Sequence, residues 1–307
     1  MILFYYLATP IKSTKVVYIP KGNINEIISY LIRKDFSLTK IDAYILRFIG
    51  YPQSGWIDIG KSSLSRGDFL YKITKAKAAL VKITLIPGET TEIFLKNVAK
   101  NLNLNFLKLK NFYIKYAPYP EGVLFPDTYY IPKGIDEKYF IYYLISSSIQ
   151  RHKNLSKKVF KNFNQKIWFK KYITIASIIQ KEAAIKEEMP LISAVIYNRL
   201  KLNMPLQMDG ALNYGKYSHI KITKKRILKD NSRFNTYKFK GLPPYPVCVV
   251  SIDAIKAALH PANVKYLYFV KSKNKKHIFA KSYKEHLRNI KSVQKWNIIY
   301  IYSTLLL

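Results

Sequence analysis

One carboxylate lies in a segment that is otherwise apolar enough to be buried, and this feature constrains the chain most. The segment ASIIQKEAAIKEEMPLISAVIYNRLKLNMPLQMDG runs from Ala176 to Gly210. The apolar residues around Glu182 leave almost no polar face, which is typical of a helix inside a sizeable domain. Because desolvation favours the neutral form, Glu182 must be paired or have a raised pKa, and a protonated Glu182 could act as a general acid on a glycosidic bond. A buried salt bridge or a solvent-facing seam is the alternative interpretation.

The residues that follow predict a second helix and a turn. Pro190 suits a first helical turn, and Asn198 and Arg199 lie near the end of the predicted helix. The turn MPLQMDG then carries Gln207 and Asp209 back toward the first helix.

The order ASIIQKE, NRL and QMD resembles the catalytic core of the YceG-like family, the endolytic murein transglycosylases. Four further segments match that family in the same order, and the resemblance covers about residues 83–290. They are LIPGETTEIFLKNVAKNLNL, EGVLFPDTYYIP, FNTYKFKGLPPYP and ALHPANVKYLYFV. Any one of them alone would be weak, since GLPP is a turn signal and YLYFV an ordinary buried strand.

The resemblance implies a lytic transglycosylase of cell-wall biogenesis, a lyase that cleaves the MurNAc–GlcNAc bond within peptidoglycan glycan strands and leaves 1,6-anhydro-MurNAc ends. It assigns the catalytic role to Glu182 and implies structural roles for Asp127 and Arg199. It also implies a substrate groove lined by Glu121, Tyr129, Gln207, Asp209, Asn235 and Tyr237.

Two other functions stay open at this point. A muramidase that uses water would need a second carboxylate, because retaining and inverting hydrolases ordinarily use two. Glu187 and Glu188 would not share the helix face of Glu182, so Asp209 is the candidate. A non-catalytic glycan-binding protein would keep the groove and tolerate the loss of Glu182.

The sequence departs from the family pattern at Gly210, where the family usually has proline. Glycine reaches positive φ easily, so we expect a freer loop and a less fixed position for Asp209 than for Glu182. A second departure follows GLPP, where Tyr245 replaces the usual glycine and the run from Cys248 to Ser251 replaces the usual Asn-Pro-Gly stretch.

Length and composition bound the fold, since 307 residues with 49% hydrophobic composition can bury one large or two modest cores. The resemblance implies an α+β protein in two parts. We expect the end of an N-terminal transmembrane helix over residues 1–12. By the same resemblance, a small LysM-like subdomain should span 15–82, followed by a larger mixed α/β catalytic domain over 83–300. In the LysM-like part, Asn23 with Glu26 and Thr39 with Asp42 should each cap a helix. A spacer without a binding role is the alternative.

The N-terminal run MILFYYLA is too short to span a bilayer, which takes roughly 20 residues. The resemblance explains it as the trailing end of a single transmembrane helix whose start lies upstream of Met1. The implied location is the inner (cytoplasmic) membrane, single-pass, with the catalytic domain in the periplasm and peptidoglycan synthases as further candidate partners. A disordered or strand-forming terminus is the alternative.

The charge is strongly positive, with 52 Lys and Arg against 18 Asp and Glu and a formal net charge of +34. The cations are spread along the chain without a helix-turn-helix or zinc-finger pattern, so we expect anionic lipid and cell-wall polymer as partners and no specific nucleic acid. The basic, aromatic-containing segment 152–171 predicts one amphipathic helix, with a membrane-surface role as a weaker possibility. One cysteine and five histidines without metal-ligand spacing predict no metal and no other cofactor.

Overall fold

The computed structural model describes residues 1–75, 80–132, 134–272, 274 and 276–304, the last eleven of these by backbone only. The chain is a mixed α/β protein that divides into two compact units. The first unit comprises Met1–Ile83, Leu102–Leu104 and Thr128–Phe140, and the second comprises Thr84–Asn101, Asn105–Asp127 and Ile141–Leu307.

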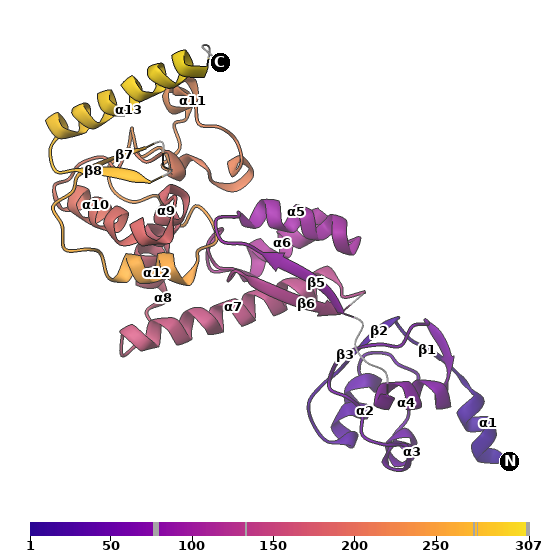
Figure 1. The fold of residues 1–307 in the computed structure, drawn as a ribbon. Helices are drawn as coiled ribbons and strands as arrows, with labels where there is room; N and C mark the ends of the chain where they lie inside the picture. The colour runs from indigo at the N-terminus through magenta and orange to yellow at the C-terminus, as the bar shows by residue number, and fades with distance from the viewer. Residues whose placement is uncertain (76–79, 133, 273, 275, 305–307) are drawn as a thin grey trace. The chain divides into compact units, whose positions relative to one another are not determined.

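The first unit contains two small antiparallel sheets and short helices (Figure 1). Strand β1 pairs with β4, and β2 pairs with β3 in the register Val16 to Asp58 and Ile19 to Gly55. The elements are α1 (Ile2–Ala8), β1 (Pro10–Lys12), β2 (Val16–Ile19), α2 (Ile24–Ile32), α3 (Ile41–Ile49), β3 (Gly55–Asp58), β4 (Ser63–Ser65) and α4 (Arg66–Lys75).

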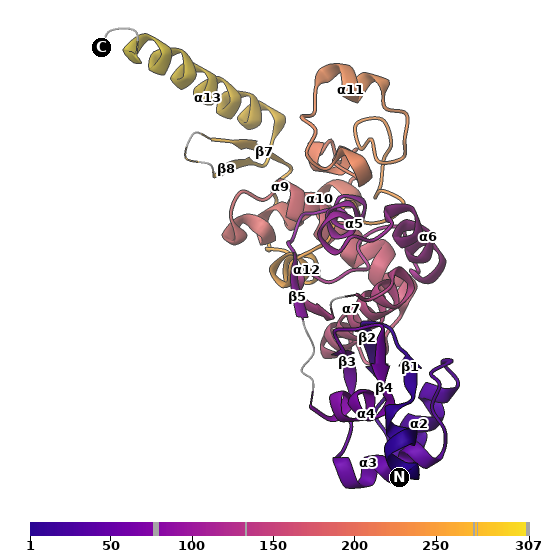
Figure 2. The same cartoon turned by 90° about the vertical axis from the view of Figure 1, so that its right-hand side faces the viewer.

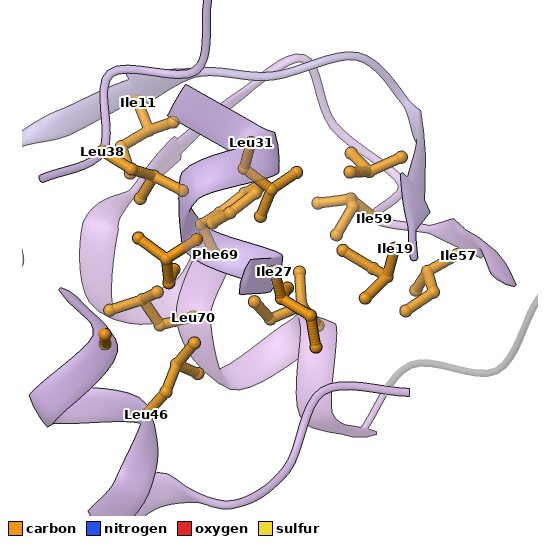
Figure 3. Packing of buried hydrophobic residues seen from close by; sticks show 14 residues of the cluster. Ile11, Ile19, Ile27, Leu31, Leu38, Leu46, Ile57, Ile59, Phe69 and Leu70 are labelled. Carbon is orange, nitrogen blue, oxygen red and sulfur yellow. The ribbon is translucent and has the colours of Figure 1, made fainter. Parts of the chain in front are cut away.

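The main hydrophobic cluster of this unit is mostly aliphatic and includes the fully buried ring of Phe69. Figure 3 shows Ile27 and Leu31 of α2 facing Phe69 and Leu70 of α4. The predicted capping box is confirmed, since Asn23 accepts from the Glu26 N–H at 3.0 Å and Glu26 accepts from the Asn23 N–H at 3.0 Å. These two bonds satisfy backbone donors that the start of a helix leaves unpaired.

The predicted cap of α3 is confirmed in part, since Lys40 is its N-cap residue but Thr39 Oγ1 accepts from the Ile41 N–H at 3.3 Å. The Asp42 carboxylate accepts from the Thr39 N–H at 2.7 Å, but Thr39 returns no bond to the Asp42 N–H through its side chain. Asp42 is fully buried and forms an ion pair with Arg66 at 2.6 Å. This long-range pairing within the core, which local sequence cannot reveal, accounts for the acidic residue here.

The N-terminal helix α1 is short and exposed. It ends at Ala8, and residues 10–12, which were expected to continue a transmembrane helix, instead form strand β1. Within the described part of the chain, no helix combines the length and the apolar character that crossing a bilayer requires.

Strands β5 (Leu80–Leu85) and β6 (Asp127–Pro132), most of whose residues belong to the first unit, pair with each other. The second unit is mainly helical. Helices α9, α10 and α12 pack together, and the hairpin of β7 and β8 lies against α13 (Figures 1 and 2). The remaining elements are α5 (Thr91–Leu102), α6 (Phe106–Tyr116), α7 (Glu137–Val159), α8 (Gln165–Ile167), a π-helical turn (Trp168–Ile173), α9 (Thr174–Glu182), a 3-10 turn (Lys186–Glu188), α10 (Met189–Lys201), two further 3-10 turns (Asp209–Leu212 and Gly215–Tyr217), α11 (Lys224–Lys229), α12 (Ile252–Leu259), β7 (Tyr268–Lys271), β8 (His277–Ala280) and α13 (Tyr283–Thr304).

The prediction of one amphipathic helix over residues 152–171 is wrong. Helix α7 ends at Val159, and a new helix starts after Asn164, whose side chain accepts from the Ile167 N–H at 3.0 Å. The following π-helical turn rotates Trp168 and Phe169 inward, where both are buried. Trp168 and Phe169 therefore belong to the core of the second unit.

Candidate functional site

Glu182 is the last residue of α9, and its carboxyl group is half-buried. The chain leaves the helix in an extended conformation at Ala183, so the carboxylate sits at a helix end and not in the middle of an apolar run. Burial raises the pKa of Glu182 to about 7, the Gly210 N–H opposes this rise, and the charge of Asp209 adds to it. The negative end of the helix dipole also disfavours an ionised carboxylate here. In the described part of the chain Glu182 forms no ion pair, which removes the salt-bridge alternative.

Gly210 approaches Glu182 closely. Its N–H donates to Glu182 Oε1 at 2.7 Å. A Cβ atom on residue 210 would lie 2.6 Å from Lys181 Cβ and 2.9 Å from Glu182 Oε1, so only glycine fits without displacement. The expectation of a loop freed by positive φ is wrong, because Gly210 is not among the positive-φ glycines and starts a 3-10 turn with Asp209. Glycine is used here for close packing.

The loop that carries Gln207 and Asp209 is tied to the chain around Thr236. The Gln207 N–H donates to the Thr236 carbonyl at 3.1 Å, and the Met208 N–H donates to Thr236 Oγ1 at 3.0 Å. Gln207 has a φ of +49°, which is uncommon for a residue with a side chain and indicates a constrained backbone. These bonds fix the backbone of the loop, although the side chains of Gln207 and Asp209 are exposed.

Asp209 is exposed beside Glu182 and is oriented by Tyr237, whose hydroxyl donates to Asp209 Oδ1 at 2.8 Å. Burial raises the pKa of Tyr237, and the bond to Asp209 and the nearby carboxylates raise it further, so the phenol keeps its proton. Asp209 therefore accepts a hydrogen bond from an oriented hydroxyl group, while its carboxylate stays exposed to solvent.

Glu182 opens on a cavity of about 440 Å³. The sequence-predicted residues Gln207, Asp209 and Tyr237 share this cavity with Glu182. The other lining residues are Arg199, Leu206, Met208, Tyr268, Phe269, Tyr283 and His286.

Arg199 supports the cavity wall. Its guanidinium donates to the carbonyls of Leu267 at 2.6 Å and Leu206 at 2.9 Å, and to Gln207 Oε1 at 3.3 Å. Its Cζ atom lies 5.0 Å from the centre of the Tyr268 ring. Arg199 thus joins the Gln207 loop to the strand at Tyr268, in keeping with the structural role expected for it.

Sequence reasoning missed Tyr283 and His286 of α13. Both follow the last recognised motif by more than ten residues, and neither stands in a spacing typical of a site. Tyr268 lies within the YLYFV segment, which the sequence indicated only as a buried strand. Only the folded chain brings these residues to Glu182.

Three of the predicted groove residues are not among those that line the Glu182 cavity. Glu121 is buried and accepts from the Thr91 N–H at 2.9 Å, Thr91 Oγ1 at 2.6 Å and the Gly122 N–H at 3.0 Å. Burial raises the pKa of Glu121 to about 7 against these three donors. Tyr129 is buried on β6 in the first unit.

Asn235, the third, is also buried. Its amide donates to the carbonyls of Ile227 at 2.7 Å and Asp230 at 2.8 Å, and its Oδ1 accepts from the Tyr237 N–H at 3.2 Å. Asn235 therefore positions the backbone beside Tyr237. Asp127 is paired with Arg151, in agreement with the structural role expected for it.

The described residues contain no group of three His, Cys, Asp or Glu side chains that could hold a metal ion. Cys248 is free and buried, and burial raises its thiol pKa. His260, which lies inside a recognised motif, is exposed and lines a different cavity from Glu182.

Comparison with known proteins gives a consistent assignment. The YceG-like family matches residues 17–292. The endolytic murein transglycosylase of Bacillus subtilis (strain 168) is 29% identical over an alignment of 306 residues that covers 90% of this chain and 83% of that protein. The endolytic murein transglycosylase of Streptococcus pneumoniae serotype 2 (strain D39 / NCTC 7466) is 33% identical over 233 residues, which cover 73% of this chain and 40% of that protein.

A solved structure also matches. The crystal structure of a YceG-like protein from Listeria monocytogenes is 27% identical, with a TM-score of 0.56, and the match covers 89% of this chain and 98% of that one. The similarity therefore extends over most of both chains.

Proposed function

Because the chain belongs to the YceG-like family, we propose that it is a murein transglycosylase that cleaves glycan strands endolytically. The observation that carries this proposal is Glu182, a carboxyl group with a pKa raised to about 7 on the wall of a 440 Å³ cavity. A general acid works best when its pKa lies near the operating pH. The names of the two relatives supply the substrate class, murein.

The proposed reaction breaks the bond between MurNAc and GlcNAc. Protonated Glu182 donates its proton to the glycosidic oxygen as the bond from that oxygen to C1 of MurNAc breaks, and GlcNAc leaves with a free hydroxyl. The acetamido group of MurNAc stabilises the positive charge that develops at C1. The Gly210 N–H, 2.7 Å from Oε1, stabilises the carboxylate that remains on Glu182.

The second step uses the same carboxylate as a base. Glu182 takes the proton of the MurNAc 6-hydroxyl while that oxygen bonds to C1, which closes a 1,6-anhydro ring. Glu182 ends protonated and no water is consumed. One carboxyl group thus serves as acid and then as base, which suits a site where the other carboxylate, Asp209, is exposed and held by Tyr237.

A water-using muramidase is the second candidate, and the position of Asp209 favours it. Asp209 borders the same cavity, and its charge raises the pKa of Glu182, as expected for two carboxylates in one site. In that reaction Asp209 would activate water or stabilise the cation. A non-catalytic glycan-binding protein is the third, and it would show no cleavage at all.

Analysis of the products tests these reactions. Purified glycan strands are digested in water enriched in ¹⁸O, and the new ends are examined by mass spectrometry. Anhydro ends that are one water lighter and carry no ¹⁸O support the transglycosylase. Reducing ends that carry ¹⁸O support the muramidase, and an unchanged length distribution contradicts both.

We also propose that the first unit is a LysM-like module that holds glycan. Tyr18 and Trp56 lie on paired strands with ring centres 5.1 Å apart, and both are partly exposed, so their rings suit stacking on sugars. Retention of the full chain on insoluble peptidoglycan, compared between the native sequence and Trp56→Ala, tests this. Unchanged retention of a folded variant would favour a spacer.

The proposed location is the outer side of the cytoplasmic membrane, where murein lies, with an N-terminal tether and peptidoglycan synthases as candidate partners. The side chains of α1 support a tether, since Ile2 is 89% and Phe4 76% exposed. Fractionation of cells that produce the native protein tests it, and recovery in the cytosol would contradict it.

A further inference from the structure

His286 has no role in the reaction described above, although it lies on the wall of the Glu182 cavity. Its imidazole stacks on Tyr268, with ring centres 5.2 Å apart and an angle of 22° between the planes. Arg199 lies against the same Tyr268 ring and is itself bonded to the Leu267 carbonyl. The orientation of the His286 ring is therefore set by a packed group that also supports the Gln207 loop.

The surroundings of His286 favour the neutral form of its imidazole. Burial lowers the pKa of His286, and the charge of Arg199 lowers it further. A neutral imidazole carries one proton, so one nitrogen donates and the other accepts. The choice of tautomer decides which nitrogen can act on a ligand.

The surroundings of the two nitrogens indicate that the proton is on Nε2. Nδ1 is enclosed and has no hydrogen-bond partner among the described residues. An enclosed N–H without an acceptor is rarer in proteins than an under-used acceptor, so Nδ1 is better left unprotonated. Nε2 is not enclosed in this way, and His286 borders the cavity.

We propose that the His286 Nε2–H donates a hydrogen bond to an oxygen of the saccharide that occupies the Glu182 cavity. The inference rests on the proposed function and names a residue that positions the glycan. His286 transfers no proton in either step, because the neutral ring keeps its one proton on Nε2. Its effect should appear in substrate affinity.

The test uses three substitutions at residue 286 of the full chain. His286→Phe keeps a flat ring for Tyr268 but removes the donor. His286→Gln places an amide N–H near the position of Nε2, whereas His286→Asn places one near Nδ1. His260→Phe is the matched control, because His260 is exposed and lies outside the Glu182 cavity.

Two measurements are made on soluble, uncross-linked glycan strands. The first is the KM and kcat of cleavage by each variant. The second is calorimetric binding in the Glu182→Gln background, where cleavage does not interfere. We expect His286→Phe and His286→Asn to raise KM and Kd about 3- to 10-fold, as for the loss of one hydrogen bond, with kcat within about twofold. His286→Gln should restore most of the affinity, and His260→Phe should match the native chain.

The outcomes separate this inference from the proposed function. Native affinity in a folded His286→Phe variant overturns the inference and leaves the function intact. Equal weakening by Phe, Asn and Gln also overturns it, since the ring and not the donor would then matter. If the native chain cleaves no strand but His286→Phe weakens binding and Gln restores it, the proposed function fails and the glycan contact stands.

Discussion

Glu121 is a buried and Glu182 a half-buried carboxyl group of the same unit, and burial raises the pKa of each to about 7. Glu121 accepts from three donors, two of them on Thr91, and it lies at a smaller cavity of about 170 Å³. Glu182 accepts one hydrogen bond from the described residues, that of the Gly210 N–H, and opens on the 440 Å³ cavity. A raised pKa therefore does not identify an acid by itself. Spare hydrogen-bonding capacity and access to a ligand distinguish the two sites.

The largest expected effect is that of Glu182→Gln. The amide is nearly isosteric but cannot transfer a proton, and general acid–base catalysis is typically worth about 10²- to 10⁴-fold. We expect the rate of cleavage to fall by about this factor or more, while the melting temperature and glycan binding stay unchanged. Glu187→Gln, an exposed neighbour, is the control and should be fully active. Retention of a third of the native turnover would contradict the catalytic role of Glu182. Glu121 and Glu182 would then not differ in catalytic function.

The next largest effect is expected at Gly210. A Cβ atom in Gly210→Ala would lie 2.6 Å from Lys181 Cβ, so the loop must shift away from Glu182. A misplacement of about 1 Å can lower a rate about 100-fold, and we expect kcat to fall on the order of 10- to 100-fold. Gly67→Ala is the control, because its Cβ would lie at an ordinary 3.5 Å from Leu7. Native kcat in Gly210→Ala would mean that close approach of this N–H is not required.

Asp209→Asn should have a smaller effect if Glu182 acts alone. Removing the charge of Asp209 lowers the pKa of Glu182, so the loss of activity on the alkaline side should begin at a lower pH. We expect about tenfold or less in kcat at neutral pH, measured over a pH series with Asp253→Asn as the exposed control. A loss equal to that of Glu182→Gln would instead favour the two-carboxylate muramidase.

The sequence predicted the features that depend on nearby residues. Examples are the capping box of Asn23 and Glu26, the end of α10 near Arg199, and a carboxyl group of raised pKa at Glu182. The sequence did not predict features that depend on contact with a residue far away in the chain. Asp42 pairs with Arg66, 24 positions on, and Gly210 is selected by its packing against Lys181.

Sequence reasoning also could not predict which distant residues line the Glu182 cavity. His286 reaches the cavity of Glu182 from a helix more than a hundred positions later in the chain. No periodicity or spacing connects such residues, because their proximity depends on how β7, β8 and α13 pack. Glu121 shows the converse, since a motif suggested a groove residue where the structure has a buried carboxyl group bonded to Thr91.

The smallest expected effect on activity is that of Glu121→Gln, which should act on stability. The amide NH₂ would face backbone N–H donors, and an unsatisfied buried polar group costs about 1 to 3 kcal/mol. We expect a lower free energy of unfolding in urea, with kcat and KM within about twofold of native. Glu92→Gln, which removes surface ion pairs to Lys96 and Lys110, is the control and should cost about 1 kcal/mol or less. A large change in KM without loss of stability would support the prediction that Glu121 lines the substrate groove.

The stability of the folded chain should also depend on pH through Glu121. The pKa of Glu121 is about 7 in the folded protein against an ordinary value of 4.5, so the folded state binds this proton more tightly than the unfolded state. Its contribution to stability is fully present below pH 4.5 and is lost as the pH rises through about 7. Burial lowers the pKa of His152 to about 4, which changes stability in the opposite direction, so the measurement is a difference between matched chains. Both chains carry Glu182→Gln. Between pH 4.5 and 7, the free energy of unfolding should fall more in the chain that keeps Glu121 than in the chain that also carries Glu121→Gln. Parallel pH curves would mean that Glu121 is not protonated in the folded chain, and only Glu182 would then combine burial with a retained proton.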